Sequence, residues 1–238
     1  FFSNGQFVNP MVLRVPGLGY QKGFGGHFHN DNSLTIFRDI PGLVLAIPSN
    51  GADAVRMLRT AVKEAYKNGR IIVFIEPIAL YMTKDLYKAK DGKWEFIYPK
   101  LNDESPIGEF KSYGNGRLLT ILTYGNGLYL SLQAQKDIEK KLGKKIKIID
   151  LMWISDINYE TLLKEISPCK KILIVDECRR SGCHGEGILT NLILKSKTSL
   201  NIDLHAAEDS FISIGNAATA TLPSKDSIVQ NALNLVNA

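Results

Sequence analysis

The feature that most constrains the fold is a pair of continuous apolar runs, residues 43–48 and 70–77, separated by a helical pattern. Continuous apolar runs of this length are typical of strands buried on both faces of a parallel sheet. The helix between them should end at Asn68 and Gly69, because glycine favours a helix C-terminus. Strand, helix and strand with short connections predict a right-handed parallel crossover. The apolar positions of the helix follow the helical period: Ala54, Met57, Leu58, Ala61, Val62 and Ala65.

The same alternation restarts in the second half of the 238-residue chain. Alternating strands and helices are typical of a doubly wound α/β domain. We therefore expect an α/β protein with two parallel-sheet units. In the second half the patterns predict strands over 118–123, 146–152, 171–177 and 201–205, and helices over 128–142, 159–166, 185–194 and 224–236.

Residues 84–117 interrupt the alternation with lysines, aspartates, prolines and glycines. A connection this long is unusual inside one compact domain and is typical of a domain boundary. We interpret residues 1–83 as one domain, 84–117 as a linker and 118–238 as a second domain. The aromatic side chains of the linker are expected to lie on one domain or on a partner chain: Trp94, Phe96, Tyr98 and Phe110.

Composition and charge exclude several classes of function. The net charge of +5 comes from scattered basic residues without an aromatic-rich basic strand, so nucleic-acid binding is not expected. The longest apolar runs fall far below the ~20 residues that a membrane span needs, so no membrane segment is expected. With no secretory signal, the three cysteines are interpreted as reduced thiols of a cytoplasmic protein. Because the chain begins with Phe1 rather than methionine, an upstream part is expected to have been lost.

Two groups of titratable side chains invite a metal or acid–base role. Cys178, Cys183 and His184 are soft ligands, but neither a fourth ligand nor a CxxC pair accompanies them, so we expect no metal. Glu76 ends an apolar run just before a proline, and we interpret it as locally paired. A second acidic group invites the same question: Asp176, Glu177 and Glu186.

Two of the four histidines, His27 and His29, lie in a glycine-rich loop after the apolar run 10–16. The stretch 17–26 contains five glycines, a composition that no regular element tolerates. A loop at the end of a strand is where α/β sheets place their chemistry. The spacing alone leaves both possibilities open, since the histidines are either solvated loop residues or functional groups.

Short stretches in both halves match one known family in order and spacing. In the first half they are residues 9–16, 29–32, 39–48 and 74–77, with Leu80 and Tyr81. This half resembles the latter part of the pyrimidine-binding domain in the β subunit of thiamine diphosphate-dependent 2-oxoacid dehydrogenases. The second half resembles the transketolase-type C-terminal domain of the same subunits through residues 149–151, 175–177, 182–186, 214–216 and 222–224. The resemblance implies a partial pyrimidine-binding-type parallel-sheet domain followed by a doubly wound transketolase C-terminal-type domain. It also implies that the acidic group Asp176, Glu177 and Glu186 is structural and lies toward a subunit contact.

The resemblance implies that His29 is catalytic. In that family a His-Ser-Gln stretch occupies the position of His29, Asn30 and Asp31, and its histidine faces the cofactor and the substrate. His29 would then hydrogen-bond the carboxylate or the developing alkoxide of the substrate and move protons, a task that suits a group titrating near neutral pH. Asn30 and Asp31 depart from the family pattern, and with His27 they are expected beside the substrate or in support of the loop.

The resemblance also implies thiamine diphosphate bound with Mg²⁺, mostly by parts of the complete enzyme outside this chain. The family's glutamate that activates the cofactor lies upstream of this sequence, and the chain has no Gly-Asp-Gly motif for Mg²⁺ and diphosphate. We therefore expect this fragment to be inactive alone. Members of the family also bind a structural potassium ion through backbone carbonyls near the position of Asn68, where carbonyl ligands leave no side-chain signature.

The leading hypothesis is the C-terminal section of a first-component 2-oxoacid dehydrogenase, which decarboxylates a 2-oxoacid oxidatively and passes the acyl group to a lipoyl acyltransferase. The implied partners are an α subunit or an upstream α half, the lipoyl acyltransferase core, and a second β part in a homodimer. Residues 76–81 resemble branched-chain enzymes slightly more than pyruvate enzymes, so 2-oxoisovalerate is the expected substrate.

Three alternatives stay open. The chain is a pyruvate or acetoin dehydrogenase β subunit, or it is a module that docks the acyltransferase core without catalysis. A transketolase-like sugar enzyme shares both domains, but it would be expected to carry phosphate-binding arginines in the histidine loop. The sequence has no arginine between Arg14 and Arg38.

Overall fold

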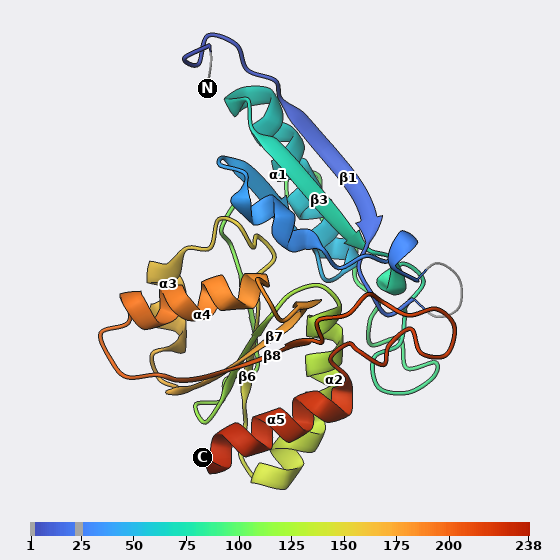
Figure 1. Ribbon diagram of the computed structural model, residues 1–238, viewed down its shortest axis with the longest axis vertical. Coiled ribbons are helices and arrows are strands. Elements are labelled where there is room, and N and C mark those ends of the chain that lie inside the picture. Colours follow the sequence, from blue (N-terminus) through green and yellow to red (C-terminus); the bar gives the residue numbers. More distant parts are fainter. Residues whose placement is uncertain (1–2, 22–25) are drawn as a thin grey trace.

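The computed structural model describes residues 3–21 and 26–238, which form two α/β units built on mainly parallel sheets (Figure 1). Residues 22–25, part of the glycine-rich stretch noted above, lie outside the described residues. The α/β prediction is confirmed by the order of elements along the chain.

The first unit is a three-stranded parallel sheet with the order β1-β3-β2. The predicted parallel crossover between β2 and β3 is therefore confirmed. Its helix begins after Asn50, whose side chain accepts a hydrogen bond from the Asp53 amide, and ends at Gly69 with a φ of 64°. The elements are β1 (Met11–Gly17), β2 (Leu43–Ala46), α1 (Gly51–Asn68) and β3 (Ile71–Pro77).

The second unit is a five-stranded sheet with the order β4-β6-β5-β7-β8, in which only the edge strand β4 is antiparallel. Two helices cover each face, α2 and α5 on one side and α3 and α4 on the other (Figure 1). The prediction of a doubly wound unit is confirmed. Its strands are β4 (Lys111–Tyr113), β5 (Thr120–Thr123), β6 (Lys147–Asp150), β7 (Lys171–Arg179) and β8 (Asn201–Ala207). Its helices are α2 (Asn126–Leu142), α3 (Tyr159–Ile166), α4 (His184–Lys195) and α5 (Lys225–Asn237).

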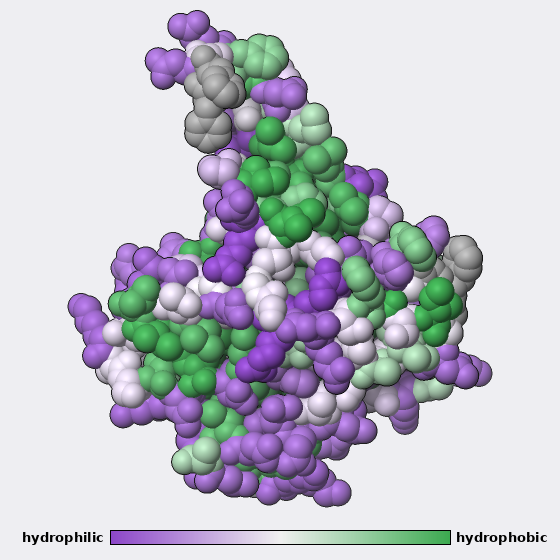
Figure 2. All heavy atoms as spheres, viewed as in Figure 1, coloured by the Kyte–Doolittle hydropathy of each residue, from purple (hydrophilic) through white to green (hydrophobic). Residues whose placement is uncertain are grey.

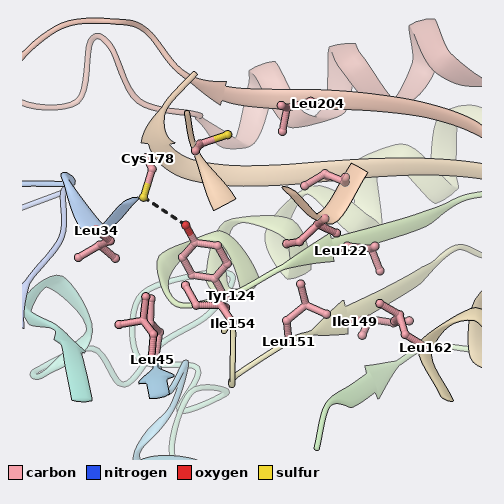
Figure 3. Close-up of a cluster of buried hydrophobic side chains, with 14 of the residues drawn as sticks. Leu34, Leu45, Leu122, Tyr124, Ile149, Leu151, Ile154, Leu162, Cys178 and Leu204 are labelled. Atoms are coloured by element: carbon pink, nitrogen blue, oxygen red, sulfur yellow. Dashed lines mark hydrogen bonds between the residues drawn. The ribbon is translucent and has the colours of Figure 1, made fainter. Parts of the chain in front are cut away.

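Alternate residues of the central strands enter two different cores. Ile121 and Leu173 pack under α2 and α5, whereas Leu122 and Ile174 pack under α3 and α4. The second of these cores continues into the first unit through Leu34 and Leu45, as Figure 3 shows. The two units therefore share one apolar core rather than meeting through a thin interface.

A short backbone connection also joins the units. The Ile47 amide donates to the Met152 carbonyl at 2.8 Å, and the Ile154 amide donates to the Leu45 carbonyl at 3.0 Å. Trp153 between them is fully buried against the α1 face of the first sheet. These contacts place the carboxyl ends of strands from both sheets in one region of the molecule.

The segment between the units is ordered by contacts with both. The Trp94 ring packs edge to face on Tyr129 of α2 at 5.1 Å, and the Ser105 amide donates to the Arg56 carbonyl of α1. The strand β4 lies inside the predicted linker 84–117. The sequence did not predict it, because a three-residue edge strand is too short to leave a periodic signal. The proposed domain boundaries at 83/84 and 117/118 stay a prediction.

The first unit exposes apolar side chains along its edge strand. Met11, Leu13 and Val15 of β1 are 37–43% exposed, and apolar surface gathers over this strand in the upper part of Figure 2. Within the described residues β1 pairs only with β3, so its outer edge has no neighbouring strand. Among the helices that the structure describes, none has the length and apolarity required to cross a bilayer.

Candidate functional site

The loop after β1 exposes His29. His27 lies in the short 3-10 helix η1 (Gly26–Phe28), and the backbone amides of His29 and Asn30 both donate to the Gly26 carbonyl, at 3.4 and 2.9 Å. This turn leaves the His29 residue exposed and buries Asn30. The loop starts at the carboxyl end of a parallel strand, which is where α/β folds place functional groups.

Gly26 is required for this turn. Its φ is 48°, in the left-handed region that favours glycine. A Cβ atom at this position would lie 2.8 Å from Cγ1 of Ile214, a residue of the second unit. The histidine turn therefore packs closely on the segment that follows β8.

The end of β7 holds the loop after His29. The Asn32 side-chain amide donates to the Glu177 carbonyl at 2.8 Å. The Arg179 guanidinium donates to Asn32 Oδ1 at 2.9 Å, to Asp31 Oδ1 at 3.4 Å and to Ser33 Oγ. The two predicted site residues Asp31 and Asn30 thus differ, since Asp31 is exposed and ion-paired whereas Asn30 points into the protein.

An aromatic cluster supports the other side of the turn. The His27 ring lies 4.1 Å from the Phe28 ring and 4.8 Å from the Phe211 ring, measured between centroids. The Arg179 guanidinium lies over the same Phe211 ring, with its Cζ atom 5.4 Å from the ring centroid. His27 is therefore engaged in ring contacts, and His29 in the same loop is exposed.

Asn30 is a buried polar group of this loop whose side chain lacks a hydrogen-bond partner in the described part of the chain. It is 1% exposed, and neither Oδ1 nor Nδ2 has a hydrogen-bond partner among the described residues. Burying an amide without a hydrogen bond is unfavourable, so such groups are rare and often lie at functional sites. The expectation that Asn30 lies beside the substrate stays a prediction.

Behind the loop, Asp176 organises a buried polar network. It accepts hydrogen bonds from the Tyr124 hydroxyl at 2.5 Å, the Gly185 amide at 2.7 Å and the Cys178 amide at 2.8 Å. The Gly185 amide belongs to the first turn of α4, whose N-terminus favours a negative charge. Burial raises the pKa of Tyr124 well above its usual value. These contacts support the structural interpretation of Asp176.

Glu177 is also enclosed, but its hydrogen-bond partner differs from those of Asp176. Its carboxylate accepts hydrogen bonds from the Asn126 side chain at 3.0 Å and from the Asn126 amide at 3.3 Å, at the start of α2. Burial raises the pKa of Glu177 to about 8, and the nearby Asp176 acts in the same direction. The carboxyl therefore holds its proton at neutral pH, inside the protein rather than at the exposed loop.

A third buried carboxyl, Asp150, lies at the end of β6 between the two units. The Ser49 hydroxyl donates to its Oδ1 at 2.9 Å, and its Oδ2 has no partner among the described residues. Burial raises the pKa of Asp150 to about 8. The adjacent Asp53 is buried as well, but it is paired with Lys111 and with Arg56. Asp150 is thus a neutral, buried link between the units at pH 7.

The three cysteines and His184 form no metal centre. All three thiols are free and buried, and burial raises the pKa of Cys183 to about 12, which makes it a poor nucleophile. Burial lowers the pKa of His184. Across residues 3–21 and 26–238, no group of three or more His, Cys, Asp or Glu side chains is placed to hold a metal ion.

A separate pocket of about 670 Å³ lies at the carboxyl ends of β2 and β3, beside the first turn of α1. Glu76 accepts hydrogen bonds from Arg14 Nε and from the Tyr81 hydroxyl, each at 2.5 Å. Burial alone would raise the pKa of Glu76, but these two donors outweigh it and lower the pKa. The local pairing expected for Glu76 is confirmed. His29 is not among the residues that line this pocket.

The sequence placed His27, His29, Asn30 and Asp31 in one loop, and the structure keeps them together there. It adds Arg179, which sequence reasoning missed because it is 148 residues away from Asp31 along the chain. Its position at the carboxyl end of a buried strand was the available signal. An arginine therefore does contact the histidine loop, although none lies within the loop sequence.

Comparison with known proteins places both units in one group of relatives. The "Transketolase, C-terminal domain" family matches residues 108–221. A "Pyruvate dehydrogenase E1 component subunit beta" from Acholeplasma laidlawii is 34% identical over 180 residues, which are 75% of this chain and 50% of that protein. A protein of the same name from Staphylococcus aureus is 25% identical over 239 residues, covering 98% of this chain and 67% of the relative. The chain thus spans between half and two thirds of the length of these relatives.

Two solved structures share the fold. One is described as "Split gene transketolase, inactive beta4 tetramer", with a TM-score of 0.66, 17% identity, and coverage of 94% of this chain and 66% of that one. The other is a transketolase from Campylobacter jejuni, with a TM-score of 0.61, 15% identity, and coverage of 94% and 31%. The chain therefore carries a transketolase C-terminal domain and is homologous to the β subunits of the pyruvate dehydrogenase E1 component.

Proposed function

We propose that this chain forms one wall of the active site of a thiamine diphosphate-dependent 2-oxoacid dehydrogenase first component, with His29 as its catalytic residue. The observation that carries this proposal is the placement of His29, exposed at the carboxyl end of β1 between two anchored segments. The homology to pyruvate dehydrogenase E1 component β subunits supports it.

His29 would act on the oxygen atoms of the substrate. A ring N–H donates a hydrogen bond to the carboxylate or to the oxygen on which negative charge develops, and the same nitrogen delivers or removes a proton there. One positioned acid–base group of this kind typically contributes about a hundred- to ten-thousand-fold in rate. The anchored turn limits the orientations that the imidazole samples, which favours a reactive geometry.

The described residues fit only part of the cofactor's requirements. When bound, thiamine diphosphate supplies the electron sink for decarboxylation. In the described part of the chain, no cluster of three or more acidic or histidine side chains suits Mg²⁺ and diphosphate. We assign that end of the cofactor to a partner α subunit or an upstream α half. Among the described residues, the exposed His29 and the side-chain amide of Asn30, which has no partner there, are groups that this chain offers to a polar ligand.

The partners and the substrate follow from the same proposal. We expect a lipoyl acyltransferase core to receive the acyl group and a second β part to complete the assembly. The two relatives are named for pyruvate, which makes pyruvate the first substrate to test. The expectation of 2-oxoisovalerate from residues 76–81 stays a prediction, since one methylene of selectivity needs a change of only about 1–3 kcal/mol.

The test uses the full-length source protein with its α part, thiamine diphosphate and Mg²⁺. Decarboxylation would be followed with an artificial electron acceptor, comparing pyruvate with 3-methyl-2-oxobutanoate. His29→Ala should lower turnover at least about a hundredfold without changing assembly. The control is His205→Asn, because the His205 ring is bonded to Ser227 in the second unit. Unchanged turnover in His29→Ala would contradict the catalytic role.

A second candidate function is a docking module without catalysis. It is favoured by exposed apolar side chains in the connecting segment, where Met82, Ile97 and Leu101 are 84–93% exposed. Large exposed apolar side chains are often found at protein contacts. If this candidate is right, His29→Ala leaves both turnover and assembly unchanged, whereas Ile97→Lys weakens the assembly measured by sedimentation.

A further inference from the structure

At the end of β7, the side chain of Arg179 is directed from its strand toward the first unit. β7 pairs with β8 in register up to Asp176 and Ala206, and the next pair is Arg179 and Ala207. Two residues of β7 therefore oppose none of β8. A bulge of this kind redirects the side chain that follows it.

The two extra residues of the bulge are anchored inside the protein. The Glu177 carboxylate is bonded to Asn126, and the Cys178 thiol lies 3.3 Å from the Tyr124 hydroxyl, a contact drawn in Figure 3. Both residues are at most 2% exposed. The direction of the Arg179 side chain is thus determined by the core of the second unit and not by the histidine loop.

The Arg179 guanidinium contacts the segment after His29 and also an aromatic ring that packs on His27. On one side it donates to Asp31, Asn32 and Ser33. On the other side it stacks on Phe211, whose ring lies against His27. A guanidinium suits this task because it offers five donors in a planar group that also stacks on aromatic rings.

We propose that Arg179 is a positioning residue for His29, through which the second unit sets the orientation of the histidine turn. The effect on catalysis rests on the function proposed above, whereas the effect on the turn does not. Without Arg179, the segment after His29 would keep the bond from Asn32 to the Glu177 carbonyl but would lose its charged anchor. The turn would then open more often, and the His29 ring would sample more orientations.

The neighbouring Arg180 provides a matched control. Its Nη1 donates to the Leu204 carbonyl at 3.1 Å, and its backbone amide donates to the Ala207 carbonyl, so its contacts stay within the second unit. Arg179→Gln and Arg180→Gln therefore remove the same charge from adjacent positions. Only the first removes the contacts to the histidine loop.

The experiment measures the loop in the 238-residue chain by NMR and amide hydrogen exchange. In Arg179→Gln the backbone amide of Asn30 should exchange about tenfold faster, because hydrogen bonds to a charged group contribute at least that factor. The ring signals of His27 and His29 should shift, while amides of β5 keep their exchange rates. Arg180→Gln should leave all of these unchanged, and Arg179→Lys should restore part of the protection.

Ser33→Ala is a milder variant that keeps the proposal testable if Arg179→Gln does not fold. It removes one acceptor of the guanidinium and should change the Asn30 exchange rate in the same direction by a smaller factor. Unchanged exchange and unchanged ring signals in both variants would overturn the proposal. Equal effects in Arg180→Gln would overturn it as well, because they would show a general loss of stability.

Turnover of the full-length enzyme separates this proposal from the proposed function. If the turn loosens in Arg179→Gln and kcat falls with little change in KM, the positioning role is supported. If His29→Ala keeps full turnover while Arg179→Gln still loosens the turn, the proposed function fails and the structural part of this proposal stands. If His29→Ala is inactive but the turn is unchanged in Arg179→Gln, only the positioning role fails.

Discussion

The histidine loop and the carboxyl end of β7 lie against each other, yet the polar groups of the two regions have opposite environments. Around Asp176, the donors of Tyr124, Gly185 and Cys178 are enclosed by protein and paired. Around His29, the turn exposes an imidazole, and the buried side-chain amide of Asn30 has no hydrogen-bond partner within residues 3–21 and 26–238. Satisfied buried networks make a structure rigid, whereas an exposed group on an anchored turn is accessible to a ligand.

This difference shows that a large pKa shift does not by itself mark a reactive group in this protein. Burial raises the pKa of both Asp150 and Glu177 to about 8, but each carboxyl is enclosed and hydrogen-bonded to a neighbour. Structural networks shift pKa values as functional sites do. Accessibility together with anchoring distinguishes His29 from these groups.

The largest expected effect comes from breaking the buried hydrogen-bond network around Asp176. Asp176→Ala should lower the free energy of unfolding by roughly 3–5 kcal/mol, because each buried donor left unpaired costs about 1–3 kcal/mol. Urea denaturation followed by circular dichroism measures this loss. The control is Asp209→Ala, which removes an exposed acceptor of Ser181 and should have a much smaller effect. Equal losses in the two variants would contradict the picture of a buried network.

A smaller effect than that of Asp176→Ala is expected at the turn itself. Gly26→Ala places a side chain in the left-handed region, which costs about 1–2 kcal/mol, and also brings its Cβ against Ile214. The matched control is Gly42→Ala, with a φ of 79° and no atom within 4 Å of the new Cβ. Gly26→Ala should therefore be the more destabilising by about 1 kcal/mol or more. Similar losses in urea denaturation would show that the turn does not pack on Ile214 as described.

A third expected effect, which is measured against pH rather than at one pH, is a pH dependence of stability. Burial raises the pKa of Asp150 from near 4 in the unfolded chain to about 8, so folding takes up a proton between these values. The stability that it contributes is full below about pH 4 and is lost as the pH rises through about 8. The free energy of unfolding should therefore fall less between about pH 5 and 8 in Asp150→Asn than in the parent.

The pH profile of the parent protein alone does not test this prediction. Burial lowers the pKa of His184 and His205, and these groups change stability in the opposite direction below their unfolded pKa of about 6.5. The difference between Asp150→Asn and the parent removes their contribution. A parent and variant with parallel pH profiles would show that Asp150 is charged in the folded protein at pH 7.

Local patterns in the sequence were enough to predict most of the regular structure. The helix predicted over 159–166 matches α3, and the helix predicted over 224–236 differs from α5 by one residue at each end. The apolar runs became buried strands in two mainly parallel sheets, because the strand and helix periods are properties of neighbouring residues. The short antiparallel β4 left no such pattern and was included in the expected linker.

The sequence by itself thus determined the α/β class, the crossover around α1 and the loop that carries His27 and His29. The tertiary structure decided which groups this loop meets, because Arg179 and Phe211 approach it from the second unit. It also decided that Asp150 is buried between the sheets. Periodicity reports which face of an element is apolar, whereas contacts between distant residues depend on how whole sheets pack, and a single sequence does not encode that in any local pattern.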